Sequence, residues 1–153
     1  MADMKKAAKT TASSAGYSGT PLPKKLGWLD GGRLVLVSAP KGIDADIAPQ
    51  PKGAVLASKL GVREELVVLF CKDAATLKKS LPGVSAKLAA DGALWISWPK
   101  KASRLFVDLT EDMIRTIVLP TGLVDVKVCA INADWSGLKL MVRKELRTKW
   151  NKS

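Results

Sequence analysis

The chain lacks histidine entirely, although it is 153 residues long. Histidine is the usual base in Ser-His-Asp and Cys-His nucleophile systems and a common metal ligand, so its absence excludes these enzymes and all imidazole metal sites. Cysteine is scarce as well, because only Cys71 and Cys129 occur, both inside apolar runs. They are too few for a disulfide framework or a structural zinc site. The sequence therefore predicts no metal, and leaves acid-base chemistry to Asp, Glu, Lys, Cys and the single Tyr17.

Long apolar runs are also missing from the sequence. Runs such as residues 65–71 (ELVVLFC) are much shorter than the roughly 20 residues that a membrane helix needs. Residues 1–16 carry lysines but no apolar segment of the kind found in a secretory signal. We therefore expect a cytoplasmic protein with no membrane partner.

A further absence concerns the glycine-rich motifs that bind nucleotides. The segment SAPKG (residues 38–42) follows the first predicted strand, where a dinucleotide-binding fold would carry G-x-G-x-x-G, and no P-loop pattern is found either. The sequence thus predicts neither a standard NAD site nor a standard ATP site, and we expect no cofactor.

What the sequence does contain is enough apolar material for one folded domain, since 47% of its residues are hydrophobic and its mean hydropathy is +0.08. Residues 1–16 are rich in Lys, Ala, Ser and Thr and lack apolar periodicity, which is typical of a flexible basic arm. We expect a single α/β domain over residues 17–147 and a basic C-terminal tail over residues 148–153.

Extended apolar runs alternate with helical patterns along this domain. Strands are predicted for residues 33–40, 65–71, 93–98, 123–131 and 137–146. Helices are predicted for residues 22–26, for residues 73–90 with Asp73 as the N-cap and an interruption at Pro82, and between Thr110, the N-cap candidate, and Gly122. Residues 54–60 fit either a short edge strand or a helical turn. Because a short linker joins the last two strands, the order predicts a Rossmann-like three-layer α/β sandwich, with a mostly parallel sheet and a C-terminal antiparallel β-hairpin strand.

Ligands of open α/β sheets collect outside the carboxyl ends of the parallel strands. One of these ends carries the segment LWISWPKKASR, in which tryptophans stand beside lysines and an arginine. The residues predicted to bind an anion at this edge are Lys41, Lys72, Trp98, Lys100, Lys101 and Arg104. Further residues expected in the same crevice are Cys71, Asn132, Asp134, Trp135 and Ser136. Asp134 and Trp135 are equally typical of a hairpin turn.

Other residues in this set also have a purely structural interpretation. Trp95 is expected in the core, while Trp98 is either a core residue or a stacking surface beside the cations. The basic run is either an anion-binding rim or a solvated stretch. Cys71 is either a thiolate stabilised by Lys72 or an inert buried thiol. Near the C-terminus, Trp150 among basic residues fits either single-stranded nucleic acid binding or a solvated tail.

Several segments carry a resemblance to a known family. They are GYSGTPLPKKLG (16–27), GALWISWPKKAS (92–103), DLTEDMIRTIVLPTGLVDVKVCAI (108–131) and WSGLKLMVRK (135–144). Together they resemble a bacterial family of small proteins that is catalogued only as a domain of unknown function, over residues 17–147. The order of the last strands and helices is also similar to the C-terminal half of class I S-adenosylmethionine-dependent methyltransferases, which implies a Rossmann-like fold.

The formal net charge of +11 favours an anionic partner, because excess Lys and Arg attract phosphates, although the same charge also keeps a small protein soluble. Our leading hypothesis is a non-catalytic binding module for an anionic ligand, either a nucleotide-like molecule or nucleic acid. One alternative is a divergent S-adenosylmethionine-dependent methyltransferase-like enzyme, with Asp134, Lys101 or Cys71 as participants. A second alternative is a protein-protein interaction module that uses the basic arms.

Overall fold

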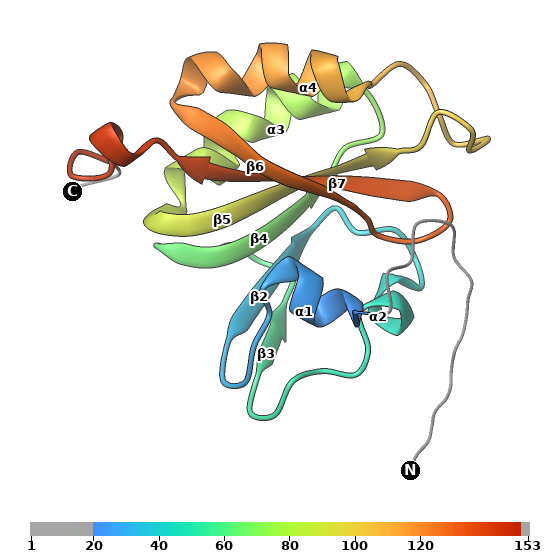
Figure 1. Ribbon diagram of the computed structural model, residues 1–153, viewed down its shortest axis with the longest axis horizontal. Coiled ribbons are helices and arrows are strands. Elements are labelled where there is room, and N and C mark those ends of the chain that lie inside the picture. The colour runs from blue at the N-terminus through green and yellow to red at the C-terminus, as the bar shows by residue number, and fades with distance from the viewer. Residues whose placement is uncertain (1–19, 151–153) are drawn as a thin grey trace.

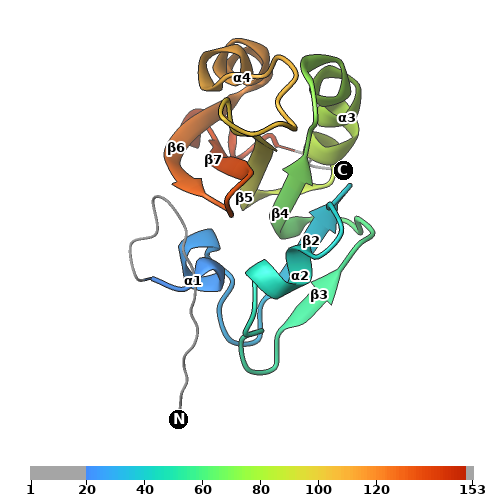
Figure 2. The same ribbon diagram turned by 90° about the vertical axis from the view of Figure 1, so that its right-hand side faces the viewer.

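The computed structural model describes residues 20–150 as one sheet with helices on both faces (Figures 1 and 2). The strands are β2 (Arg33–Val37), β3 (Val55–Ala57), β4 (Glu64–Phe70), β5 (Leu88–Pro99), β6 (Leu123–Ala130) and β7 (Trp135–Val142). The helices are α1 (Leu22–Leu26), α2 (Ile43–Asp46), α3 (Ala74–Ala86) and α4 (Glu111–Val118), with short 3-10 helices η1 (Leu119–Thr121) and η2 (Lys144–Leu146). None of the helices in this part of the chain is long and apolar enough to cross a membrane.

The strands are arranged in the order β3-β2-β4-β5-β7-β6. Strands β3, β2, β4 and β5 are parallel, with Val35 opposite Val67 and Val67 opposite Leu94. Strand β7 runs antiparallel to both β5 and β6 and closes the C-terminal hairpin. The structure therefore confirms the predicted Rossmann-like α/β class with an antiparallel hairpin strand.

Two apolar clusters hold the layers together, one on each face of the sheet. Helices α3 and α4 cover the face formed by Leu94, Ile96 and Trp98. Helices α1 and α2 cover the opposite face, on which Trp95 and Phe70 are buried. This division follows from the period of two residues in a strand, which sends successive side chains to opposite faces. The predicted core position of Trp95 is confirmed.

Some element boundaries differ from the sequence-based expectation. Residues 55–57 form an edge strand beside β2, which decides between the two interpretations of this segment. Helix α3 continues through Pro82 without interruption, because buried Leu81 and Val84 hold its last turns on the core although proline removes one backbone donor. Strand β5 starts at Leu88 rather than at residue 93. Glu64 pairs with Leu88 and Leu66 with Ala93, so the extra residues of this irregularity lie in β5.

The end of the described chain is packed onto the domain. Trp150 lies against the α3/α4 core, and its indole Nε1 donates a hydrogen bond of 3.1 Å to the carbonyl of Leu88. An indole that is packed and hydrogen-bonded in this way is not a free stacking surface. Neither the nucleic-acid interpretation nor the solvated-tail interpretation of Trp150 therefore fits its position.

The strand order creates a switch point between β2 and β4. The chain leaves β2 toward β3 on one side, whereas it leaves β4 toward β5 on the other side. The loops that follow these neighbouring strands therefore separate, and in open α/β sheets the crevice between such loops is the usual ligand site. Here the loops begin at Ser38 and at Cys71.

Candidate functional site

The carboxyl edge of the sheet holds most of the residues that the sequence singles out. Lys41 follows β2, and Cys71 and Lys72 follow β4. Lys100 and Lys101 follow β5, which runs parallel to these strands. The turn between β6 and β7 reaches the same edge, because β6 is parallel to β5 through their common neighbour β7. That turn and its flanks carry Asn132, Asp134, Trp135 and Ser136.

The apolar members of this set are buried. Trp98 is only 6% exposed and belongs to the α3/α4 core, so it offers no stacking surface beside the cations. Trp135 packs edge-on against Phe70, with ring centroids 5.3 Å apart. Burial, together with the charge of Asp73, raises the pKa of the Cys71 thiol to about 12. Cys71 therefore stays protonated at neutral pH, and the inert interpretation of this residue applies.

The polar members of the hairpin turn are engaged in structural hydrogen bonds. The Asn132 side-chain oxygen accepts hydrogen bonds from the amides of Asp134 and Trp135, and its Nδ2 donates one of 3.0 Å to Asp46. The Asp134 carboxylate accepts a hydrogen bond of 2.9 Å from the hydroxyl of Ser103. These contacts tie the turn to α2 and to the loop after β5, as turn side chains commonly do.

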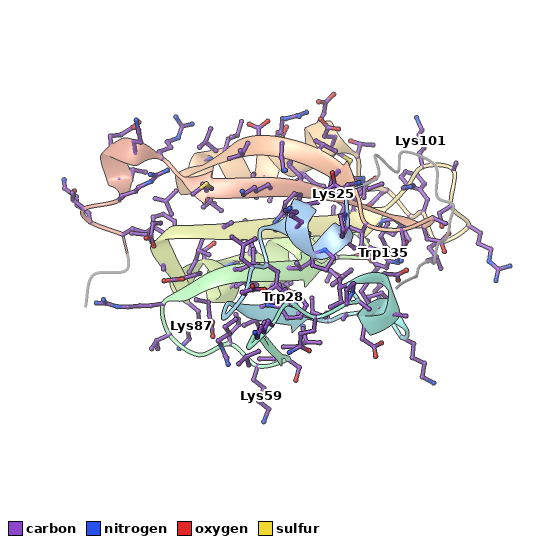
Figure 3. The ribbon with its side chains drawn as sticks, turned by 60° about the horizontal axis from the view of Figure 1, so that its bottom comes forward. Lys25, Trp28, Lys59, Lys87, Lys101 and Trp135 are labelled. Atoms are coloured by element: carbon purple, nitrogen blue, oxygen red, sulfur yellow. The ribbon has the colours of Figure 1, made fainter. Side chains whose placement is uncertain are left out.

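The cations at the carboxyl edge are matched by carboxylates. The cations are Lys41, Lys72, Lys100, Lys101 and Arg104, and an equal number of acids follows the same strand ends, namely Asp44, Asp46, Asp73, Asp108 and Asp134. Figure 3 shows that the labelled lysines Lys25, Lys59, Lys87 and Lys101 are spread around the molecule rather than gathered at this edge. Among residues 20–150, the cations at this edge are therefore balanced by nearby acids, and other lysines lie elsewhere on the surface.

Two of these acids cap the first turn of α3 at the switch point. Asp73 accepts a hydrogen bond of 2.8 Å from the amide of Thr76, and Asp108 accepts one of 3.0 Å from the amide of Ala74. The hydrogen bonds from Thr76 hold the pKa of Asp73 below its ordinary value. Backbone amides at a helix N-terminus are the usual binding groups for phosphate. In α3 those two amides are already bound to negatively charged side chains.

Sequence reasoning finds Asp73 as the N-cap of this helix but misses Asp108. The reason is that Asp108 lies 34 positions from its partner Ala74, so no local pattern announces the contact. Helix α4 has its own cap, since the hydroxyl of Thr110 accepts a hydrogen bond from the amide of Met113, as predicted.

The N-cap leads to a direct prediction. The substitution Asp73→Ala should lower the free energy of unfolding by about 1 kcal/mol, because it leaves the amide of Thr76 without its acceptor. Urea denaturation measures this loss. The neighbouring Lys72→Ala removes an exposed side chain instead, and should change stability by less than about 0.5 kcal/mol. Equal effects of the two substitutions would contradict the assigned capping role.

The loop after β2 turns sharply although it lacks a glycine-rich motif. Ser38 has φ of 59°, and Gly42 has φ of 84°. A left-handed conformation is uncommon for a residue other than glycine, and such positions cluster at functional sites. The turn at Ser38 is therefore formed by a serine, although glycine is the usual residue in this backbone conformation.

The opposite, amino-terminal edge of the sheet is also polar and was not predicted to be so. Two hollows of about 260 Å³ and 290 Å³ lie there, and both are lined by Arg33 and Glu65. Beside them, the buried Glu64 accepts hydrogen bonds from Arg33 Nε at 3.0 Å and from the amide of Gly61 at 2.6 Å. Burial on its own would raise the pKa of Glu64, but the bonds from Arg33 and Gly61 outweigh it and hold the pKa below its ordinary value. Within residues 20–150, no group of three or more Cys, Asp or Glu side chains is placed to hold a metal ion.

The fold resembles that of solved methyltransferases. A S-adenosylmethionine-dependent methyltransferase from Aquifex aeolicus has a TM-score of 0.54 at 14% identity, covering 80% of this chain and 88% of that one. The glycopeptide N-methyltransferase MtfA, solved with sinefungin, has a TM-score of 0.52 at 13% identity, covering 86% and 88%. A type 11 methyltransferase described from Sulfolobus solfataricus has a TM-score of 0.51 at 14% identity, covering 80% and 90%. No protein-family model and no curated protein sequence matches the chain.

These comparisons correct the expected partner. The sequence predicts an anionic ligand, either a nucleotide or nucleic acid, and this prediction is wrong. Among the solved proteins compared above, one is described as S-adenosylmethionine-dependent, and MtfA was solved with sinefungin. The carboxyl edge of this chain agrees with the correction, since it balances cations with carboxylates and caps α3 with Asp73 and Asp108. What the chain shares with the solved methyltransferases is their Rossmann-like fold.

Proposed function

We propose that the chain binds S-adenosylmethionine, or a close analogue of it, at the carboxyl ends of β2 and β4. The observation that carries the proposal is the pair of carboxylates, Asp73 and Asp108, on the first-turn amides of α3. They disfavour a phosphate at the switch point, because like charges at close range repel. S-adenosylmethionine has no phosphate, and it carries a sulfonium and an ammonium group against one carboxylate. The likeness to methyltransferase folds supports the same ligand.

The residues present at the edge fit such a ligand. Asp44 follows β2, is exposed, and offers a carboxylate to ribose hydroxyls or to the ammonium group. Lys41 and Lys72 lie on the two loops that separate at the switch point, and either ammonium suits the carboxylate of the ligand. Ser38, whose backbone is left-handed, begins the same β2 loop, and its hydroxyl is a further group able to form hydrogen bonds there.

The chemistry available to the protein limits the reaction class. When bound, S-adenosylmethionine supplies an electrophilic methyl group. The chain itself offers no histidine as a base, and the pKa of Cys71 is raised to about 12. Asp134 is held by Ser103 in the hairpin turn. We therefore assign to this edge the binding and orientation of the ligand, and expect any methyl acceptor to be nucleophilic without deprotonation by these residues.

Isothermal titration calorimetry tests the proposal. The full chain should bind S-adenosylmethionine, S-adenosylhomocysteine and sinefungin, and should not bind ATP under the same conditions. Raising the salt concentration should change the affinity little, because a ligand with both charge signs releases few counterions overall. Binding of ATP without binding of S-adenosylmethionine, or binding of neither, would contradict the proposal.

Asp44 provides the residue-level test of this site. Asp44→Asn should weaken binding of S-adenosylmethionine about tenfold or more, because a hydrogen bond to a charged group contributes roughly 1.5–3 kcal/mol. Asp91→Asn is the matched control, since Asp91 is also exposed but lines the hollow at the amino-terminal edge. An equal loss of affinity in both variants, or no loss in either, would show that the ligand does not bind at the β2 loop.

A further inference from the structure

The loop between β5 and α4 exposes apolar and basic side chains and is anchored by hydrogen bonds at both of its ends. At its start the amide of Lys100 donates a hydrogen bond of 2.7 Å to the Asp134 carbonyl, and at its end Asp108 binds the amide of Ala74. Between these anchors Leu105 is 46% exposed and Val107 is 58% exposed. We call Lys100, Lys101, Arg104, Leu105 and Val107 the basic patch; no ion pair is seen for its cations within residues 20–150.

A second patch of opposite charge lies next to the first. Arg115 on α4 binds Glu111, Asp112 and Asp125, so these acids outnumber the cation that they share. On β6, beside Asp125, Val126 is 50% exposed and Val128 is 44% exposed. We call Glu111, Asp112, Asp125, Val126 and Val128 the acidic patch.

The chain path places the two patches side by side. The loop that carries the basic patch runs directly into α4, whose first residues are Glu111 and Asp112. The bond between Arg115 and Asp125, 2.9 Å long, then fixes α4 to β6, above which it lies in Figure 1. One region of the surface therefore carries exposed apolar side chains flanked by a positive area on one side and a negative area on the other.

We propose that this region binds a second copy of the same chain, with the basic patch of each copy on the acidic patch of the other. A two-fold axis makes such an arrangement self-complementary, because each contact then occurs twice. Exposed apolar clusters with a charged rim are typical of protein interfaces, and opposite charges set the register. The charge complementarity between Arg104 and Asp112, both exposed, is what favours a second copy over an unrelated partner.

The contact is made by side chains rather than by pairing of the β6 edges. Strand β6 contains a register irregularity between Asp125 and Lys127, and Lys127 lies with Cys129 on the α1 side. A bulge and a lysine on an outer strand are devices that oppose continuous strand pairing. The exposed valines remain available to the loop of the other copy.

Charge exchange tests the proposal with the full chain. Sedimentation equilibrium should show a monomer–dimer equilibrium that weakens as salt is raised. Arg104→Glu alone, or Asp112→Arg alone, should weaken self-association at least about tenfold, since each variant places like charges in contact. An equimolar mixture of the two variants should associate again, because the two substituted side chains then meet with opposite charges at one contact, while the native pair forms the other.

The control and the contrary results are equally specific. Lys87→Glu reverses a cation at the end of α3 and should leave self-association unchanged. Circular dichroism checks that each variant is folded before it is compared. A wild-type chain that stays monomeric at all concentrations overturns the proposal, and so do variants that associate like the wild type or a mixture that fails to associate. The ligand titration described above is independent of these outcomes, so failure of one proposal is distinguishable from failure of the other.

Discussion

Replacing Trp95 with alanine is expected to lower the free energy of unfolding by about 3–5 kcal/mol. Trp95 is fully buried in the cluster between the sheet and helices α1 and α2. Its indole Nε1 donates a hydrogen bond of 3.0 Å to the carbonyl of Leu26, at the end of α1. The substitution therefore leaves both a cavity and a buried acceptor without its donor. Urea denaturation monitored by far-ultraviolet circular dichroism, which does not rely on tryptophan fluorescence, measures the loss of stability.

A second variant separates the two contributions. Trp95→Phe retains much of the ring volume but not the indole donor, so it should cost less than Trp95→Ala and still loosen α1. Hydrogen exchange should then speed up at the amides of α1 more than at those of α4, which lies on the other face. Val62→Ala, at a side chain that is 75% exposed, should change stability by less than about 0.5 kcal/mol. Uniformly faster exchange on both faces would argue against a local anchor at Leu26.

The fold was predictable because strand signals in this chain are local. Residues 65–71 and 93–98 are mostly apolar, and they contribute most of the central strand β4 and the buried part of β5, with both faces covered. The boundary of β5 was missed, because its first residues depend on pairing between Glu64 and Leu88. Pairing of this kind depends on residues distant in the sequence, which a periodicity within one segment does not reveal.

The positions of the candidate residues were predictable from the strand order, but their contacts were not. Strand order alone places Lys41, Lys72 and Lys100 at the carboxyl edge, and they are found there. A net charge of +11 is a sum over the whole chain, however, and it contains no information on where acids and bases meet. The carboxylate of Asp108 on the amide of Ala74 places a negative charge at the N-terminus of α3, close to where an anion site was expected. This contact exists only in the folded chain.

Replacing Glu64 with glutamine is expected to lower the free energy of unfolding by about 2–3 kcal/mol at neutral pH. Glu64 is 4% exposed and accepts hydrogen bonds from both Arg33 and the amide of Gly61. Loss of one partner of a fully buried ion pair costs roughly 3–5 kcal/mol. The value here is lower, because the side chain of Arg33 is 45% exposed and water solvates it when the carboxylate is gone.

The pH dependence of this effect identifies its electrostatic origin. Because the pKa of Glu64 is lower in the folded chain than in the unfolded one, its carboxylate contributes stability above about pH 4.3, and this contribution is lost as the pH falls through the folded pKa. The difference in stability between the wild type and Glu64→Gln should therefore shrink on acidification below that pH. The adjacent Glu65→Gln changes an exposed carboxylate and should differ from the wild type by less than about 0.5 kcal/mol at neutral pH. If the stability difference between the wild type and Glu64→Gln stays constant at acidic pH, packing rather than the ion pair with Arg33 makes this position important. The amino-terminal edge of the sheet would then be stabilised by packing and not by this ion pair.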